Sequence, residues 1–435
     1  MTPQDLDKVA HSFTTFHAHF APLFGRSEAR LRSEQYLRGL LLQHADRRNA
    51  ENIAEAVEGA TPRALQRFLT QAPWQHLPVI EALHRFLGPR LSSPEGVFIF
   101  DESGAAKQGK HSVGVARQYS GTLGKVGNCQ VGVYLAYASF LGHALLDGEL
   151  YLPKEWTDDP VRCAETGVPK GVQFQTKGDL AFILLQRAKL WGQLQGEWVT
   201  GDSVYGGDSG LRDSLDEGGW YYVLEVRQTE RVFATATRPD TAVPTWSGQG
   251  RKPYRERLVA GSAPAQTVAD IAKAVADEEE EWETLSVAEG AQGERRYQFF
   301  RRRVWECRDD LPGRECWLLV RRKLDGSDLK FCLCNAPITT SLLKMGQVGA
   351  SRWHIETEFE LEKSEAGLVE YEVRSFAGWY HHMSMALLAG AFLLQMQQEW
   401  GEKDAPNHAA TGEPGSARAT APTRVEQGGA NCLAA

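Results

Sequence analysis

Three acidic residues lie where the sequence predicts two strands and a helix. The apolar runs FIFDES and WVTGDSVYG each look like a strand that delivers an aspartate at its carboxyl end, Asp101 in the first and Asp202 in the second. The stretch SRWHIETEFELEKSEAG, residues 351–367, predicts a helix, because apolar and charged residues are interleaved and neither Pro nor Gly interrupts it before its last residue. Glu356 lies on this helix.

One edge of the predicted helix combines charged and aromatic side chains. Arg352, Glu356, Phe359 and Lys363 recur at steps of four, three and four residues, so each lies about one turn from the next. Such an edge is more often a solvated face than a functional one. The two strand-end aspartates favour the functional interpretation, because they would give Glu356 acidic partners.

Three carboxylates at one edge of a sheet repel one another unless divalent cations neutralise them. Ligands that are all oxygen select magnesium or manganese. Two such ions, about 3.5–4 Å apart, activate a water or a 3′-hydroxyl and stabilise the leaving oxygen in an in-line phosphoryl transfer. Arg352 and Lys363, beside Glu356, would bind phosphates of the scissile strand or orient the acid. The candidate catalytic residues are therefore Asp101, Asp202, Glu356, Arg352 and Lys363, and the first three are the candidate metal ligands.

The elements that must position these residues follow the order β, β, β, α, β, α, β from residue 96. A mixed sheet flanked by helices in this order is typical of a ribonuclease-H-like core, so we expect an α/β (α+β) fold. The predicted organisation is an N-terminal helical DNA-binding domain at 1–95, the first part of the catalytic core at 96–227, a β-rich insertion at 228–345, the C-terminal helices of the core at 346–400, and a disordered tail at 401–435.

The N-terminal segment contains a candidate helix-turn-helix, NAENIAEAVEGATPRALQRFLTQAPW. Thr61 is a good N-cap, and Pro62 suits the first position of the second helix. That helix would direct Arg63, Gln66 and Arg67 outward, which suits contact with a DNA groove or with phosphates. The same motif also packs without DNA, and the sequence leaves the two interpretations evenly balanced.

Two further regions offer cations for DNA contact. In the insertion, GQGRKPYRER carries Arg251, Lys252, Arg255 and Arg257 near Trp246. Cations interleaved with aromatic residues suit phosphate contact and base stacking, although a solvated basic loop has the same composition. Around the core, the candidates are Lys107, Lys110 and His111 in the polar segment after Asp101, and Arg374 near the C-terminus; a plain hairpin and a structural ion pair are the alternatives for them.

The bulk composition is that of an ordinary globular protein. The chain has 435 residues and a formal net charge of -8, which argues against gripping nucleic acid by overall charge but not against local basic patches. The seven cysteines form no C-x-x-C pair, so we expect reduced thiols and no structural zinc. We also expect a cytoplasmic location without membrane contact, since there is no signal pattern and the longest apolar run, Met383 to Leu394, is too short to span a bilayer.

The motifs around the three acids resemble the DDE transposases of bacterial insertion sequences. The residues that carry the resemblance are DESGAAKQGKHSVGVARQYSGTLGK, GDSVYG and WHIETEFELEKSEAGLVEYEVRSFAGWYHH, and the similarity runs from about residue 20 to 395. Arg352, Glu356 and Lys363 match the spacing of the branch with a Tyr-x2-Arg-x3-Glu-x6-Lys signature. Gly349 stands where that signature has Tyr, which puts the contribution of the tyrosine to DNA-phosphate contact in doubt here. The subgroup is often described as DDE superfamily endonucleases.

This resemblance implies an activity and its partners. Asp101, Asp202 and Glu356 would bind two Mg²⁺ ions, with Mn²⁺ as the alternative, for cleavage and strand transfer of DNA in cut-and-paste transposition. The N-terminal helices would bind the terminal inverted repeats, and a homodimer would act on paired ends and on target DNA. In better-known relatives the insertion helps to hold a flipped base while the donor end forms a hairpin, and Trp246 would be the stacking residue.

Three other functions remain open from the sequence. GDS at residues 201–203 suggests a serine hydrolase, although that motif usually lies near the start of the chain. A non-catalytic DNA-binding protein derived from a transposase would keep the same fold. An independent metal-dependent nuclease without strand transfer would use the same site.

Overall fold

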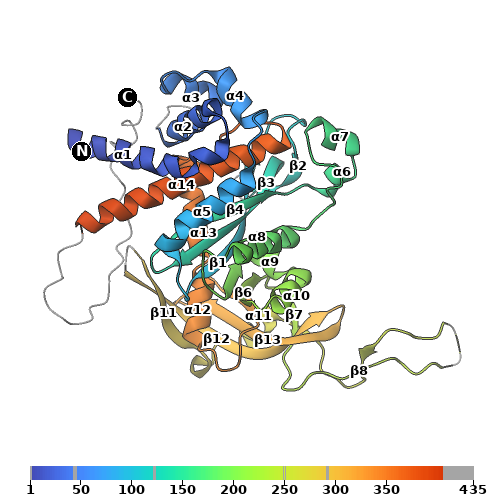
Figure 1. The fold of residues 1–435 in the computed structure, drawn as a ribbon. Helices are drawn as coiled ribbons and strands as arrows, with labels where there is room; N and C mark the ends of the chain where they lie inside the picture. The colour runs from blue at the N-terminus through green and yellow to red at the C-terminus, as the bar shows by residue number, and fades with distance from the viewer. Residues whose placement is uncertain are drawn as a thin grey trace. The chain divides into compact units, whose positions relative to one another are not determined.

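The chain divides into two compact units, which are described separately. The computed structural model describes residues 2–42, 47–120, 124–247, 249, 251–290 and 293–404. Unit 1 comprises Met1–Gly196 together with Trp353–Ala435, and unit 2 comprises Glu197–Arg352. The chain therefore leaves unit 1 after its first strands and returns to it with the helix that carries Glu356 (Figure 1).

The N-terminal part of unit 1 is helical, as predicted. Its helices are α1 (Pro3–Phe20), α2 (Ser27–Leu41), α3 (Ala50–Ala56), α4 (Pro62–Thr70) and α5 (His76–Leu91). They pack against the long helix α14 (Phe376–Asp404), which contacts α1, α2, α4 and α5. Aromatic rings fill this interface; Phe16 of α1, for example, meets Phe392 of α14 at 5.4 Å. No helix among the described residues has an apolar stretch long enough to cross a membrane.

The rest of unit 1 is a sheet with a helix on each face. Its strands are β1 (Val97–Ala106), β2 (Ala116–Ser120), β3 (Lys125–Ser139) and β4 (Gly142–Leu150). The long β3 pairs antiparallel with β1 on one side and with β2 and β4 on the other. Helix α13 (Trp353–Glu365) packs against β1 and β4, and α8 (Lys177–Trp191) packs against β3 and β4. The short helices α6 (Lys154–Thr157) and α7 (Pro160–Glu165) connect β4 to α8.

Alternation along the strands decides which residues meet which helix. Tyr134 of β3 meets Phe359 of α13, with ring centroids 5.3 Å apart. Asp147 and Glu149 lie opposite the odd-numbered residues of β3, and Arg187 of α8 reaches both carboxylates at 2.8 and 2.7 Å. Since successive side chains in a strand point to opposite faces, α13 covers one face of this sheet and α8 covers the other.

Unit 2 is built around a second sheet. Its main strands run in the order β5 (Trp198–Gly201), β6 (Tyr221–Val226), β14 (Lys330–Cys334), β13 (Leu311–Arg322) and β12 (Gly293–Arg308). β12 also pairs with β11 (Glu283–Gly290) and with β7 (Arg231–Phe233). β7 in turn pairs with β10 (Gln266–Thr267). β8 (Thr241–Ala242) and β9 (Arg257–Leu258) form a separate pair. The helices are α9 (Ser203–Gly206), α10 (Ser209–Glu217), α11 (Val268–Ala274) and α12 (Leu342–Ala350).

The segment predicted as a β-rich insertion, 228–345, does contain the strands expected of it. However, β14 is hydrogen-bonded directly to β6, a strand predicted for the catalytic core. β5 and β6 therefore continue without interruption into the sheet that the segment forms. The predicted boundary at residue 227 falls inside unit 2.

Three local predictions need correction. The first strand does not end at Asp101 but continues to Ala106, because the 15-residue β3 pairs with it throughout. The predicted helix at 351–367 begins only at Trp353, so Arg352 lies in a turn after α12 and not on the helix edge. The predicted tail begins too early, since α14 continues to Asp404; residues 405–435 lie outside the described residues.

The buried ion pair of unit 2 yields a stability prediction. Arg212 of α10 and Glu306 of β12 are each 2% exposed at the side chain, and Arg212 Nε donates to Glu306 at 2.7 Å. Arg212→Met would leave the buried carboxylate with Arg308 as its one remaining cation among the described residues, so we expect the free energy of unfolding to fall by about 3 kcal/mol in urea titrations. Arg314→Met is the control: Arg314 also binds α10, through Asp216, but is 42% exposed, and its loss should cost less than about 1 kcal/mol. Equal losses would contradict the prediction.

Candidate active site

Asp101 lies on the face of the unit 1 sheet that α13 covers. It is directly opposite Tyr134 in the β1–β3 register, and residues opposite each other in an antiparallel pair share a face. The Tyr134 ring meets Phe359 of α13 at 78°. The Asp101 carboxylate accepts a hydrogen bond from the backbone N–H of Glu102 at 2.7 Å. Asp101 is therefore half-buried between the sheet and α13.

Two glycines make room for the Tyr134 ring beside Asp101. A Cβ built at Gly132 would lie 2.8 Å from the ring, and one at Gly148 would lie 2.9 Å from it. Gly132 is two residues before Tyr134 on β3, and Gly148 is opposite Tyr134 on β4. With any larger residue at these positions the ring would have to move, and α13 packs on that ring. The glycines thus set the distance of α13 from the sheet.

The inner side of α13 carries two buried acids that fix the rotation of the helix. Glu358 is bonded to His143 of β4. Glu362 is 1% exposed and lies against α14, where a Cβ at Gly390 would fall 1.8 Å from its Oε1. Burial, together with the neighbouring Glu358, raises the pKa of Glu362 well above its usual value and so favours the protonated carboxyl.

Glu356, Phe359 and Lys363 lie along the neighbouring edge of α13, where Phe359 is buried against Tyr134 of the sheet. Glu356 is exposed, and the Lys363 ammonium lies 5.3 Å from the Phe359 ring centroid. Burial lowers the pKa of Lys363, while the nearby Asp101 carboxylate acts in the opposite direction. Unit 1 therefore brings Asp101 and Lys363 together, with Glu356 about two turns from Lys363 along the same edge of the helix.

Glu102, the neighbour of Asp101, belongs to the opposite face of the sheet. It is opposite Val133 in the register, and its carboxylate binds Lys177 of α8 at 2.7 Å. Because successive side chains of a strand alternate between its faces, Glu102 points away from Asp101. Two adjacent acids in one strand therefore serve different neighbours, which makes Glu102 a useful control for Asp101.

In unit 2, Asp202 directly follows β5, as predicted. Its carboxylate accepts a hydrogen bond from the backbone N–H of Val204 at 2.9 Å and so caps α9. A Cβ at Gly206, the last residue of α9, would lie 1.7 Å from the carbonyl oxygen of Glu225. Only glycine lets this turn approach β6 so closely, which explains the Gly in GDSVYG and holds Asp202 at the end of its strand.

Sequence reasoning missed Glu225, which lies at the same sheet edge as Asp202. β5 and β6 are parallel, with Gly201 opposite Leu224, so the next residues of both strands are acidic neighbours. Glu225 binds Arg352 at 3.2 Å and Lys330 at 3.7 Å. The signal was present in the sequence, because WYYVLEV is the next apolar strand after EWVTGDS and also has an acid near its carboxyl end.

Arg352, predicted to act at the catalytic site, is therefore bound to an acid at the carboxyl end of β6. Gly349, in the place of the signature tyrosine, lies on α12, and a Cβ there would approach Val223 of β6 at 3.3 Å. A tyrosine could project from this position only if the helix moved slightly away from the strand. The glycine instead allows α12 to pack close to β6.

The predicted DNA-contact residues of the helix-turn-helix have the expected orientation. Thr61 caps α4 and Pro62 is its first residue. Leu65, Phe68 and Leu69 are buried, while Arg63, Gln66 and Arg67 are exposed. The outward face of α4 thus matches the sequence analysis, and its DNA contacts remain a prediction.

The other candidates differ in their surroundings. Lys107 donates to the carbonyl of Tyr371 at 2.7 Å, and burial lowers its pKa to about 8, so part of its binding capacity is used within the fold. Lys110 and Arg374 are exposed. In unit 2, the guanidinium groups of Arg251 and Arg255 both lie over the exposed ring of Tyr254. The remaining candidates there, Trp246, Lys252 and Arg257, are also exposed.

The donor chemistry of these acids suits a hard divalent cation. Asp101, Asp202 and Glu356 offer only carboxylate oxygens, and none of the three is fully buried; such oxygens are the ligands that magnesium and manganese prefer. Within the part of the chain that the structure describes, no group of three or more His, Cys, Asp and Glu side chains is arranged to hold a metal ion. The acids fit the ion by type, and unit 1 adds a cation, Lys363, beside one of them.

Comparison with known proteins gives the class of this protein. The model of the DDE superfamily endonuclease family matches residues 19–294, which is more than half of the chain, and the chain belongs to that family. The matched segment contains Asp101 and Asp202 and ends before Glu356. The chain is also similar to the protein named "Probable transposase for insertion sequence element IS701" of Microchaete diplosiphon, at 29% identity over 201 residues. That match covers 46% of this chain and 49% of the relative, so the chain matches about half the length of this curated protein.

The buried Glu362 makes stability depend on pH. Its pKa is raised in the folded protein, so the fold keeps a proton that the unfolded chain releases above about pH 4.3. Stability from this group is therefore present at low pH and is lost as pH rises. We expect Glu362→Gln to gain stability relative to the wild type between pH 5 and pH 8, by at least about 1 kcal/mol, in urea titrations at each pH. Glu360→Gln, an exposed change on the same helix, should show no such trend. A stability difference between Glu362→Gln and the wild type that stays constant with pH would contradict the raised pKa of Glu362.

Proposed function

We propose that this protein is a DDE transposase that uses two divalent ions, Mg²⁺ or Mn²⁺, to cleave DNA at the ends of an insertion sequence and to transfer the cut strand. The observation that carries the proposal is the proximity of Lys363 to Asp101 in unit 1, with Glu356 about two turns from Lys363 along the same edge of α13. Membership of the DDE superfamily endonuclease family supports the nuclease chemistry.

The proposed roles follow from the chemistry of each side chain. Asp101, Asp202 and Glu356 would hold the ions, which supply an activated water or 3′-hydroxyl and stabilise the leaving oxygen. Lys363, whose ammonium lies near Asp101, would contact the phosphate next to the scissile bond as a point charge. Arg352, which is held by Glu225, would bring a fork of donors suited to a second phosphate.

The proposed partner is double-stranded DNA, as terminal inverted repeats and as target. The outward face of α4, with Arg63, Gln66 and Arg67, would contact the inverted repeats. The segment of unit 2 with Trp246, Arg251, Lys252, Arg255 and Arg257 would contact the backbone or an unstacked base. The relative's name mentions an insertion sequence element, and a homodimer on paired ends fits a reaction that cuts two ends together.

Replacement of the proposed metal ligands should abolish cleavage. With a duplex that carries the cognate element end, Asp101→Asn and Glu356→Gln should each lower the Mg²⁺-dependent nicking rate at least about 100-fold, because a lost ligand removes several kcal/mol of transition-state stabilisation. The readout is the amount of nicked strand on a denaturing gel.

Two variants control this experiment. Glu102→Gln should keep activity within a few fold, since Glu102 binds Lys177 on the other face of the sheet. Ser203→Ala should also remain active, whereas a serine hydrolase would lose its nucleophile. Normal nicking by Glu356→Gln would refute the proposed roles. Wild-type binding of the end without nicking at any Mg²⁺ or Mn²⁺ concentration would favour the non-catalytic DNA-binding alternative.

A further inference from the structure

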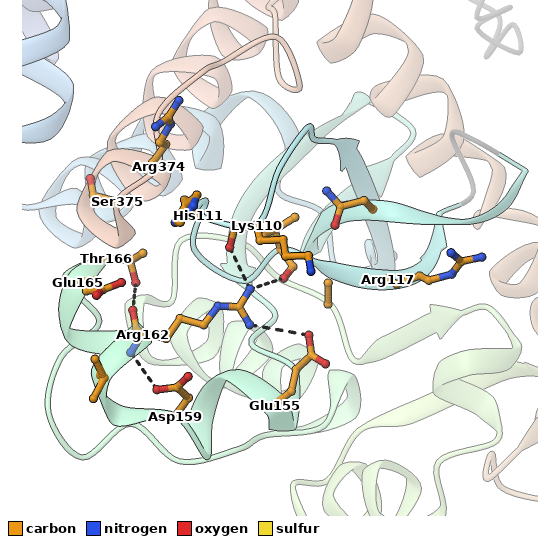
Figure 2. A pocket seen from close by; sticks show the side chains of 14 residues that line it. Lys110, His111, Arg117, Glu155, Asp159, Arg162, Glu165, Thr166, Arg374 and Ser375 are labelled. Atoms are coloured by element: carbon orange, nitrogen blue, oxygen red, sulfur yellow. Dashed lines mark hydrogen bonds and ion pairs between the residues drawn. The ribbon is translucent and has the colours of Figure 1, made fainter.

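Unit 1 contains a hollow of about 970 Å³ that neither the acids nor the helix-turn-helix explains (Figure 2). Three segments line it: 110–117 with Asn128 of the neighbouring strand, 155–166 across α6 and α7, and Arg374 with Ser375 just before α14. We propose that this hollow binds one unpaired strand of DNA by its phosphates. The inference rests on the proposed function for the identity of the polyanion, and it adds where and in what form that strand is held.

One side of the hollow carries positive charge without acidic partners. Lys110, His111, Arg117 and Arg374 are all exposed at its lining, and none of the four side chains has an ion pair to an acid among the described residues. Cations that cluster around a concave surface without acidic partners create a positive potential there. Phosphates are natural ligands for such a surface, because Arg and Lys make charge-assisted hydrogen bonds to them.

Two of the acids that line the hollow, unlike these cations, already have charged or hydrogen-bonding partners in the protein. Glu155 faces Arg162 at 3.9 Å, and Asp159 accepts the backbone N–H of Arg162 at 3.0 Å as the cap of α7. Figure 2 shows these acids, with Glu165, on the side of α6 and α7, while Lys110, Arg117 and Arg374 come from the other segments. The acidic side would repel a phosphate chain, so a bound strand should follow the cationic side.

The hollow is held in shape by hydrogen bonds between its three segments. Arg162 donates to the carbonyls of Lys110 and Val115 at 3.0 and 3.3 Å and lies 3.7 Å from the Trp156 ring centroid. Val113 N–H donates to the Arg374 carbonyl at 2.9 Å, and Phe376 N–H donates to the Thr166 carbonyl at 2.8 Å. The cations therefore project from segments that are fixed before any ligand arrives, which lowers the entropic cost of binding.

The size of the hollow favours a single strand over a duplex. Its volume of about 970 Å³ equals that of a cube with edges of roughly 10 Å, at the upper end of pockets that enclose small ligands. The major groove of B-DNA alone is about 12 Å wide, so a double helix cannot enter. A few nucleotides of a single strand can enter the hollow. The lining contains no Trp, Tyr or Phe, so phosphate contact, and not base stacking, must supply the affinity.

The test is DNA binding without catalysis. Fluorescence anisotropy of a labelled 12-nucleotide single strand of mixed sequence would be measured with the full chain in EDTA at several salt concentrations. The hollow variant is Lys110→Gln/Arg117→Gln/Arg374→Gln. The control variant, Lys154→Gln/Lys170→Gln/Lys189→Gln, removes the same charge from exposed positions of unit 1 that do not line the hollow.

We expect the hollow variant to bind the single strand at least tenfold more weakly than the control variant, and its salt slope to be smaller by about 2, since each lost phosphate contact on a single strand removes about 0.7. Binding of a blunt 20-base-pair duplex should be affected much less. Equal affinities of the two variants for the single strand would overturn the proposal, and so would a loss as large on the duplex as on the single strand.

Catalysis is tested separately, so that the two proposals can fail independently. Nicking in Mg²⁺ is measured on the wild type and on the hollow variant, with the duplex that carries the cognate element end. A wild type that never nicks DNA, together with a hollow variant that loses single-strand binding, would refute the proposed function and leave the hollow as a strand-binding site. Active nicking with unchanged binding by the hollow variant would refute only the hollow.

Discussion

The packing of α13 by its two buried acids is the constraint on which the unit 1 site depends. Glu358 is bonded to His143 on the sheet, and Glu362 lies against Gly390 on α14. An ordinary amphipathic helix would bury only apolar residues on this side, whereas here burial raises the pKa of Glu362 and favours its protonated form. If α13 rotated, Glu358 would leave His143, and Glu362 would leave the space beside Gly390 or clash with α14. Lys363 is thereby held near Asp101, and Glu356 lies about two turns away along the same edge of the helix.

The same principle, a close approach secured by glycine, recurs in both units. Gly132 and Gly148 admit the Tyr134 ring under α13, Gly390 admits the Glu362 carboxyl, and Gly206 admits the backbone of β6 beside Asp202. At each of these positions a side chain would collide with an element that carries or supports a candidate ligand. The positions of the acids therefore depend largely on neighbouring glycines, which have no side chain to fill the space.

The sequence was a good guide to elements and a poorer guide to their limits. The main strands and helices of the core, the cap at Thr61 and the outward face of α4 could be predicted, since they depend on local patterns, but β2 was missed. The continuation of β1 past Asp101 could not, because it depends on the length of a partner strand that pairs with it. Arg352 was assigned to the helix edge by spacing alone, and only the structure shows the turn and its bond to Glu225. Glu225 itself and the hollow beside Arg374 depend on segments that are distant in sequence.

In the proposed function the carboxylates of Asp101, Asp202 and Glu356 share bound metal ions. Replacement of Mg²⁺ by Fe²⁺, followed by ascorbate and peroxide, cleaves a polypeptide next to the bound iron, and the cut positions can be read by mass spectrometry. We expect cuts in three segments, around residues 101, 202 and 356, that all disappear in Glu356→Ala and are competed by Mg²⁺. Cuts elsewhere, or cuts around 101 and 202 that persist unchanged in Glu356→Ala, would contradict it.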